Sequence, residues 1–297
     1  MLRWRLQDED RRVASGGTGK IALEHGAVAW RDLTGSIGRL PLAAWLALDD
    51  IHGRYRRTVL GPLWIVIGQG AMILGFAIVF SGLFRMDPAT YLLYLAAGFP
   101  VWTLIAQFLT EMPMAFIGAK GIIESYELPW ITHIWRRSIA YILTFFHHIL
   151  ILFVAIGVMA FLALQGTSET APQLPSFANM LYAIPGLFMV LIAGTGTGLL
   201  IAVIGARYRD LQPAMQVASS FLMLLSPVVW RADHLELNTW IVELNPVYYY
   251  LRVVRDPLLG LMPPAHIWTV AGVMAVALFV LGFLVFMVSR RRLYHWL

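Results

Sequence analysis

The chain of 297 residues alternates between long apolar blocks and short polar clusters. About 20 apolar residues, each adding 1.5 Å, cross the core of a bilayer when their backbone groups are hydrogen-bonded within a helix. Five blocks exceed that length without Asp, Glu, Lys or Arg, and a sixth just meets it. The predicted spans are residues 60–84, 88–110, 138–164, 180–204, 211–230 and 267–289. The pattern therefore predicts an all-α membrane protein with six transmembrane helices.

The segment before the first span, residues 36–58, has the two-sided periodicity of an amphipathic helix. Its apolar stripe contains Ala44, Leu48, Ile51 and Tyr55, and its polar stripe contains Asp50, Arg54 and Arg57. We expect this interface helix to lie in the membrane boundary with its basic face towards the lipid headgroups.

The segment between the fifth and sixth spans, residues 231–266, is long, apolar and interrupted by four prolines. A solvated loop would be more polar, so we expect short gate helices that re-enter the outer leaflet, covered by protein or facing a water-filled cavity. The chain then divides into a polar tail over residues 1–35, the interface helix over 36–58, and a six-span domain over 59–297.

Composition agrees with a membrane protein and adds an orientation. Hydrophobic residues make up 59% of the chain and charged residues 13%, compared with about 25% charged in soluble domains. Eighteen of the 22 Lys and Arg residues lie on the side of the two termini, which predicts that both termini are cytoplasmic. The net charge of +5 is distributed between the apolar blocks, so no basic patch indicates a nucleic-acid partner.

The ionisable residues near the spans offer little chemistry. Glu111 lies at an inner span end, which favours an interfacial role over proton relay. The adjacent His147 and His148 point about 100° apart on a helix and cannot both ligate one metal. The glycine-rich stretch 15–20 lacks the spacing of a phosphate-binding loop. We therefore predict no catalytic residue, no metal and no cofactor in this chain.

Two groups of residues keep two interpretations each. The aromatic residues could pack spans or form an interfacial belt, or they could line a conduit for sugar rings. The candidates for that lining are Tyr91, Tyr94, Phe99, Trp102, Tyr248, Tyr249 and Tyr250. The arginines before the first span, Arg54, Arg56 and Arg57, could set topology or bind a phosphate headgroup through their guanidinium forks.

Several motifs, in order from about residue 40 to the C-terminus, resemble the permeases of polysaccharide-exporting ABC transporters. The most specific is Arg-Tyr-Arg-Arg at 54–57 followed by Leu-Gly-Pro-Leu-Trp at 60–64. The others are Ala-Arg-Tyr-Arg-Asp-Leu at 206–211, Ser-Pro-Val-Val-Trp at 226–230, and Leu-Asn-Pro at 244–246 followed by Arg255.

The resemblance implies a non-catalytic membrane subunit that forms a homodimer and binds two copies of a separate cytoplasmic ATPase, which holds ATP and Mg. It implies export of a lipid-linked polysaccharide, of O-antigen or capsule type, across the bacterial inner membrane. It also implies that two segments contact the ATPase. These coupling residues are Lys120, Ile122, Ile123, Glu124, Tyr126 and Glu127 in the first segment, and Arg207, Arg209 and Asp210 in the second.

Other readings remain open from the sequence. The chain could be an ABC permease for teichoic acid or another cargo, or a membrane-embedded enzyme acting on polyprenyl-linked sugars. An enzyme would need acidic or His residues that converge at the membrane surface, and none is evident. A proton-coupled flippase is disfavoured because the spans lack acidic residues.

Overall fold

The computed structural model describes residues 18–164, 175–232 and 239–297, and within these ranges all regular elements are helices. Five helical segments are long and apolar enough to cross a membrane. Their main helices are α4 (Leu63–Leu83), α5 (Pro88–Thr110), α8 (Ile131–Leu164), α10 (Ala183–Arg207) and α14 (Ala265–Ser289). The prediction of an all-α, multi-pass membrane protein is confirmed, and these helices match five of the six predicted spans.

The remaining predicted span, 211–230, forms the shorter helix α11 (Leu211–Leu225). Its 15 residues measure about 22 Å, less than the roughly 30 Å hydrocarbon core. The helix ends because Ser226 precedes Pro227, and a residue before proline disfavours helical backbone angles. Ser226 takes an extended conformation, with φ −97° and ψ 142°.

Two short helices follow in the segment where gate helices were predicted: α12 (Thr239–Glu243) and α13 (Pro246–Leu258). Asn245 caps α13, because its side chain accepts a hydrogen bond from the backbone N–H of Val247 at 2.9 Å. One face of α13 is buried against α5, α10 and α14. The first turn of α13 lines the same cavity as Met274. Met274 lies about 14 Å along α14 from the start of that helix, so α13 begins inside the bundle.

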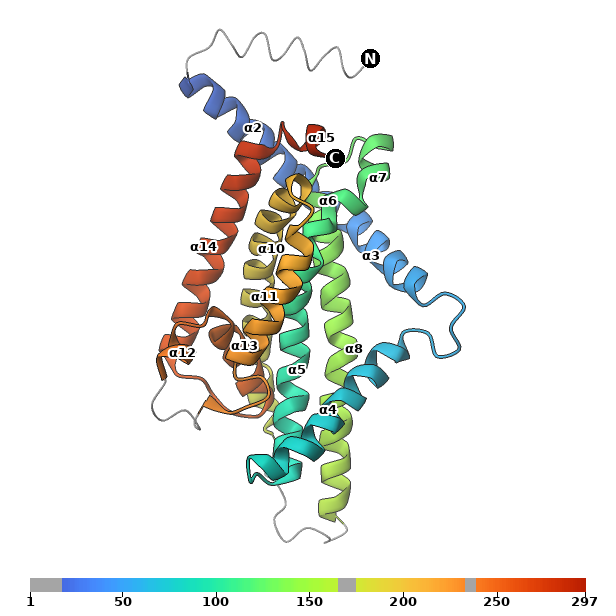
Figure 1. Ribbon diagram of the computed structural model, residues 1–297, viewed down its shortest axis with the longest axis vertical. Helices are drawn as coiled ribbons and strands as arrows, with labels where there is room; N and C mark the ends of the chain where they lie inside the picture. The colour runs from blue at the N-terminus through green and yellow to red at the C-terminus, as the bar shows by residue number, and fades with distance from the viewer. Residues whose placement is uncertain (1–17, 165–174, 233–238) are drawn as a thin grey trace.

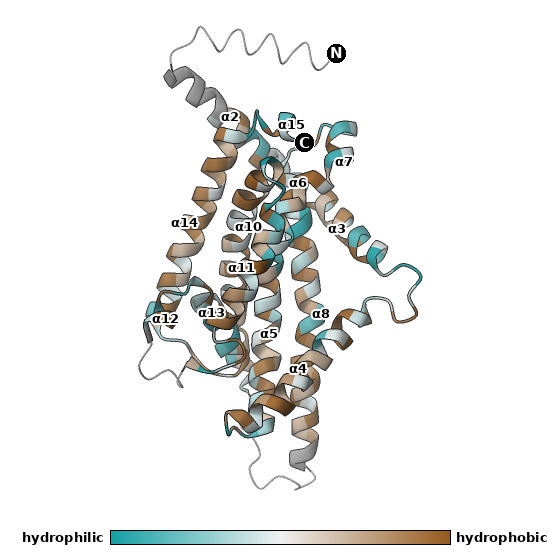
Figure 2. Ribbon diagram, in the orientation of Figure 1, coloured by the Kyte–Doolittle hydropathy of each residue, from teal (hydrophilic) through white to brown (hydrophobic). Residues whose placement is uncertain are grey.

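The molecule has two polar ends (Figures 1 and 2). One carries α2 (Thr18–Ile37), α7 (Lys120–Ser125) and α15 (Leu293–Trp296), and we call it the α7 end. The other carries α12 and the turn between α4 and α5, and we call it the α12 end. Figure 2 shows hydrophobic residues along α4, α8 and α14, with hydrophilic ones gathered at α7 and at the connection from α3 to α4.

The interface helix corresponds to α3 (Leu40–Arg54), and with α4 it forms an open V beside the bundle (Figure 1). One residue of its polar stripe faces the protein. Asp50 is ion-paired with Arg136 of α8, whereas Arg54 and Arg57 of the same stripe are exposed. Ala43 and Ala47 are buried, and Leu48 of the apolar stripe is exposed.

Part of the predicted tail, from residue 18 onwards, forms α2. Asp32 is buried and accepts hydrogen bonds from the backbone N–H of Ile131 at 3.0 Å and from Arg290 Nε at 2.8 Å. Ser36 accepts a further hydrogen bond from Trp135 Nε1 at 3.0 Å. The second half of α2 is thus tied to the first turn of α8 and to the end of α14.

Glycines allow α10 and α14 to pack closely. A Cβ atom at Gly196 would lie 2.3 Å from Phe279 Cα, and one at Gly282 would lie 2.1 Å from the carbonyl oxygen of Gly196. Such contact between backbones is typical of small residues at membrane helix interfaces.

Candidate functional site

The predicted headgroup-binding arginines lie at the apex of the V formed by α3 and α4. Arg54 is half-exposed and places Nη2 3.8 Å from Glu111 Oε2 at the end of α5. Arg56 and Arg57 are exposed in the connection that follows α3, where Arg57 has a left-handed backbone with φ +67°. Arg137 of α8 lines the same narrow cleft as Arg54. The structure thus leaves these guanidinium groups accessible at the point where the chain enters α4.

The first predicted coupling segment begins with the six-residue helix α7, which follows the short helix α6 (Ala115–Gly118), and the chain is extended at Tyr126. Ile123 is buried against this chain, and its carbonyl lies 3.5 Å from the Tyr294 hydroxyl. Glu124, Tyr126 and Glu127 are exposed. Ile123 therefore packs within the protein, and Tyr126 is the large apolar side chain of this segment that is exposed at the surface.

The second predicted coupling segment lies at the same end of the molecule, in the turn between α10 and α11. Arg207, Arg209 and Asp210 are all exposed. The Arg207 guanidinium lies 5.4 Å from the ring centroid of Trp296, and Lys120 donates to the backbone carbonyl of Leu297. The C-terminal residues thus contact both coupling segments.

Four of the aromatic residues proposed to line a conduit are buried inside the chain. Tyr91, Tyr94, Phe99 and Trp102 are each less than 10% exposed. The Tyr91 hydroxyl donates to the Val229 carbonyl at 2.6 Å, and the Tyr94 hydroxyl lies 2.8 Å from the carbonyls of Pro227 and Trp230. Tyr91 and Tyr94 therefore hold the segment after α11, and in this arrangement they do not face a conduit.

The three tyrosines of α13 separate into different environments. Tyr248 hydrogen-bonds to Arg252, and the Tyr249 hydroxyl donates to the Glu243 carbonyl at 2.9 Å. Tyr250 is buried and lines an apolar cavity, and its hydroxyl has no hydrogen-bond partner among the residues that the structure describes.

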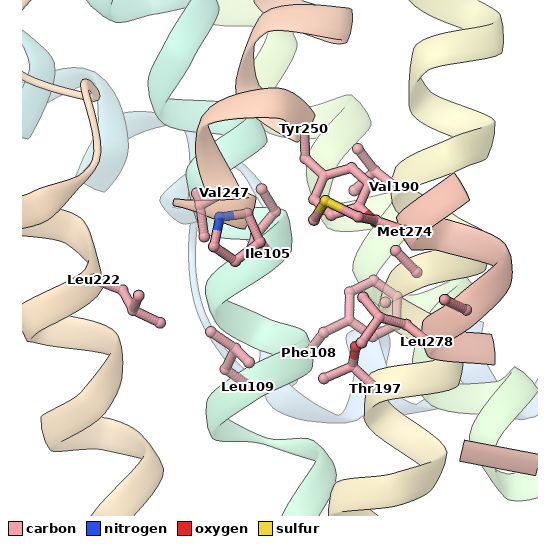
Figure 3. Close-up of a pocket in the computed structure, with 14 residues that line it drawn as sticks. Ile105, Phe108, Leu109, Val190, Thr197, Leu222, Val247, Tyr250, Met274 and Leu278 are labelled. Carbon is pink, nitrogen blue, oxygen red and sulfur yellow. The ribbon is translucent and has the colours of Figure 1, made fainter. Parts of the chain in front are cut away.

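That cavity, of about 350 Å³, lies between α5, α10, α11, α13 and α14 (Figure 3). Phe108, Val190, Leu222 and Met274 are among the side chains that line it. None of these described lining residues carries a charged side chain. The cavity does leave room for α11 and α13 to shift against α5.

Within the described ranges, no group of three His, Cys, Asp or Glu residues could hold a metal ion. His147 Nδ1 lies 2.7 Å from the Leu143 carbonyl in its own helix.

A polar pocket at the α12 end was not predicted from the sequence. It contains Arg231, Arg252 and Arg255, which are three of the four basic residues assigned to the side opposite the termini. Their isolation on that side was the available signal, but sequence could not show that two distant segments bring them together.

Comparison with known proteins identifies the family of this chain. Residues 44–259 match the family described as ABC-2 type transporter. Two proteins of Klebsiella pneumoniae, both named O-antigen export system permease protein RfbA, are each 21% identical to this chain. One alignment covers 67% of this chain and 72% of the relative, and the other covers 70% and 76%. The family match spans most of the chain, and this protein belongs to the ABC-2 type transporter family.

Proposed function

We propose that this chain is the membrane subunit of an ATP-driven exporter that moves a lipid-linked polysaccharide, of O-antigen or capsule type, across the bacterial inner membrane. The observation that carries the proposal is the exposed group Arg54, Arg56 and Arg57 at the apex between α3 and α4. Guanidinium groups bind phosphate through paired hydrogen bonds, which suits the phosphate linkage of a lipid-bound glycan. The names of the two Klebsiella relatives support the same cargo class.

The α7 end is then cytoplasmic, as the distribution of Lys and Arg favours. In this orientation α11 and the residues after it complete a sixth crossing, and α12 and α13 form the re-entrant gate. The support for a gate is the start of α13 inside the bundle, next to the apolar cavity.

The exporter would contain two copies of this chain. Exposure of α4 supports a homodimer, since among its residues only Ile73, Ala77 and Ser81 are buried. Trp64, Ile78 and Val79 are among the large apolar side chains exposed on this helix. Lipid can cover part of this surface, and a second copy would cover the face next to a conduit at the dimer axis.

Two ATPase subunits would dock at the α7 end and bind ATP and Mg, because this chain offers no nucleotide site by sequence. Their contacts would be Tyr126 with the flanking Glu124 and Glu127, together with the turn Arg207–Asp210. ATP-driven movement of α6 and α7 would pass through α8 to α3, because Asp50 joins α3 to Arg136. Movement of α3 relative to α4 would then admit the lipid phosphate beside Arg54.

Co-purification tests this function directly. The full chain expressed with a candidate ABC ATPase from the same organism should form a complex, and ATP hydrolysis coupled to export should occur only in that complex. Replacing Tyr126 by Ala should weaken the complex, whereas Tyr182→Ala, which removes an exposed tyrosine near the α12 end, should not. Substrate turnover by the isolated chain, or equal weakening by both variants, would contradict the proposed assembly.

A further inference from the structure

A polar pocket of about 420 Å³ lies at the α12 end, where helices begin and end. Thr90, near the start of α5, forms one wall, and the residues leading from α13 into α14 form another. Arg252 and Arg255 come from α13, and Arg231 comes from the segment after α11. The volume falls in the range of about 300–1,000 Å³ typical of small-ligand sites.

The basic residues of this pocket exceed its acidic ones. Asp256 is buried and receives a hydrogen bond from Arg252 Nε at 2.7 Å and a longer one from Arg255 Nε at 3.4 Å. It is the only carboxylate among the lining residues that the structure describes, and Arg252 and Arg255 share it, so these two arginines bring one more positive charge than it balances. Keeping unbalanced charge in a half-buried pocket is unfavourable unless an anion can enter.

The three arginines have different roles. Arg255 is 5% exposed and is held by the Tyr94 hydroxyl at 2.7 Å and by the Pro227 carbonyl at 2.6 Å, so it fixes the floor of the pocket. Arg252 and Arg231 are partly exposed towards the pocket. Burial opposes the charged form of Arg252, but its hydrogen bonds to Asp256 and Tyr248 raise its pKa, so it remains a cation at any physiological pH.

The remaining walls are apolar. Leu93, Leu259 and Leu261 line the pocket beside the arginines, and Leu261 is 59% exposed. A ligand that satisfies both kinds of wall has an anionic head and an adjoining hydrocarbon part. At the end of membrane helices, the molecule with that chemistry is a lipid that carries a phosphate group.

We propose that this pocket binds the phosphate of an anionic lipid at the face of the membrane opposite the coupling segments. The shared chemistry has two possible sources: the headgroup of a phospholipid in that leaflet, or the phosphate end of a polyprenyl-linked molecule. The site is separate from Arg54, Arg56 and Arg57, which lie around the connection between α3 and α4, on the side of the bundle away from α12 (Figure 1). It does not depend on the glycan class proposed above.

The test is lipid binding to the full-length chain in detergent, followed by native mass spectrometry. Four probes form two matched pairs: polyprenyl phosphate with polyprenol, and phosphatidylglycerol with diacylglycerol. We expect each phosphate-bearing lipid to bind better than its uncharged partner. Selective binding of polyprenyl phosphate identifies the polyprenyl source, and equal binding of phosphatidylglycerol identifies the headgroup source. Equal binding within both pairs would overturn the proposal.

Variants locate the binding. Arg252→Gln and Arg231→Gln should each weaken binding of the phosphate-bearing lipid about tenfold, the effect of losing one charge-assisted hydrogen bond. Arg85→Gln removes an exposed charge at the same end, outside the pocket, and should leave binding unchanged. If Arg85→Gln loses as much lipid binding as the pocket variants, the effect comes from general surface charge, and the proposal of a binding site in this pocket is wrong.

A variant of opposite sign guards against simple misfolding. Asp256→Asn keeps the shape of the side chain but raises the net charge of the pocket, so it should strengthen phosphate binding severalfold. A folded Asp256→Asn protein, judged by size-exclusion and thermal unfolding, that binds the phosphate-bearing lipid no better than wild type would contradict the electrostatic argument. If Asp256→Asn does not fold, Arg252→Lys takes its place and should retain more binding than Arg252→Gln; equal loss would contradict the proposal.

Discussion

Arg136 of α8 binds Asp50 of α3 through two hydrogen bonds, from Nε at 2.7 Å and from Nη2 at 2.5 Å. The pair is mostly buried, with side-chain exposures of 17% for Arg136 and 25% for Asp50. It attaches the helix that carries Arg54 to a helix that begins at the α7 end. A displacement of α8 would therefore be transmitted to the proposed lipid-binding apex.

Asp50→Asn should loosen α3 without preventing membrane insertion. Removing one partner leaves a half-buried guanidinium without its counter-charge, which we expect to cost about 1–2 kcal/mol after allowing for partial exposure. Hydrogen exchange of α3 and thermal unfolding in detergent measure the effect. Asp49→Asn, at the exposed neighbouring position, is the control. If α3 is equally protected from hydrogen exchange in the two variants, the ion pair does not couple α3 to α8.

The α2 helix should contribute to stability through Asp32. Its carboxylate satisfies the backbone N–H of Ile131 in the first turn of α8 and pairs with Arg290 at the end of α14. Asp32→Ala leaves both groups unsatisfied and should lower the stability of the folded state by about 1–3 kcal/mol. Arg31→Ala changes the exposed neighbour and should be near neutral. Similar melting temperatures for the two variants would show that α2 adds nothing to the bundle.

The spans were predictable because a bilayer demands a fixed length of uncharged residues, and α5 coincides with the predicted residues 88–110. The predicted span 211–230 ran past the end of α11 because residues 226–230 carry no charge. The helix itself ends at Leu225, because Pro227 disfavours helical backbone angles at Ser226. The partner of Asp50 was not predictable from the periodicity of α3. The pattern is the same whether Asp50 meets headgroups or Arg136, which lies 86 positions away.

The close packing of α10 on α14 leads to a prediction about glycine. A Cβ at Gly196 or Gly282 would collide with backbone atoms of the facing helix, so alanine there forces the helices apart. We expect Gly196→Ala and Gly282→Ala to destabilise the protein by about 1–3 kcal/mol. Gly157→Ala has open space in α8 and should instead be neutral or stabilise by about 0.5–1 kcal/mol. Thermal unfolding distinguishes these outcomes, and a uniform response would contradict the packing.

The aromatic residues show why composition could not identify the conduit. Tyr94 and Tyr250 are both buried, but only the Tyr94 hydroxyl is hydrogen-bonded, to carbonyl groups of Pro227 and Trp230 and to Arg255. Those partners lie more than 130 residues along the chain, so no local pattern reveals them. Sequence placed both tyrosines in one class, and the structure separates them by their partners.

This difference predicts opposite effects of the same substitution. Tyr94→Phe should destabilise the protein by about 1–3 kcal/mol, because buried carbonyls and Arg255 lose a partner. Tyr250→Phe removes a buried hydroxyl without a partner and should be neutral or stabilising by about 1 kcal/mol. Melting temperatures of the two purified variants test this. Equal destabilisation would mean that Tyr250 has an unrecognised polar partner.

The arginine group before α4 should control export without controlling insertion. Replacing Arg54, Arg56 and Arg57 together by Gln removes the charge-assisted hydrogen bonds to a lipid phosphate, and we expect transport to fall at least tenfold. The matched control replaces Arg31, Arg39 and Arg292, which carry the same charge towards the α7 end but lie away from the apex. Both triple variants lose the same number of positive charges, so an effect of charge on topology should be equal in the two.

The measurement is polymer at the cell surface relative to the amount of protein in the membrane. Normal surface polymer in the Arg54, Arg56 and Arg57 variant would exclude these residues from substrate binding. The same loss in both variants would assign them to orientation in the membrane.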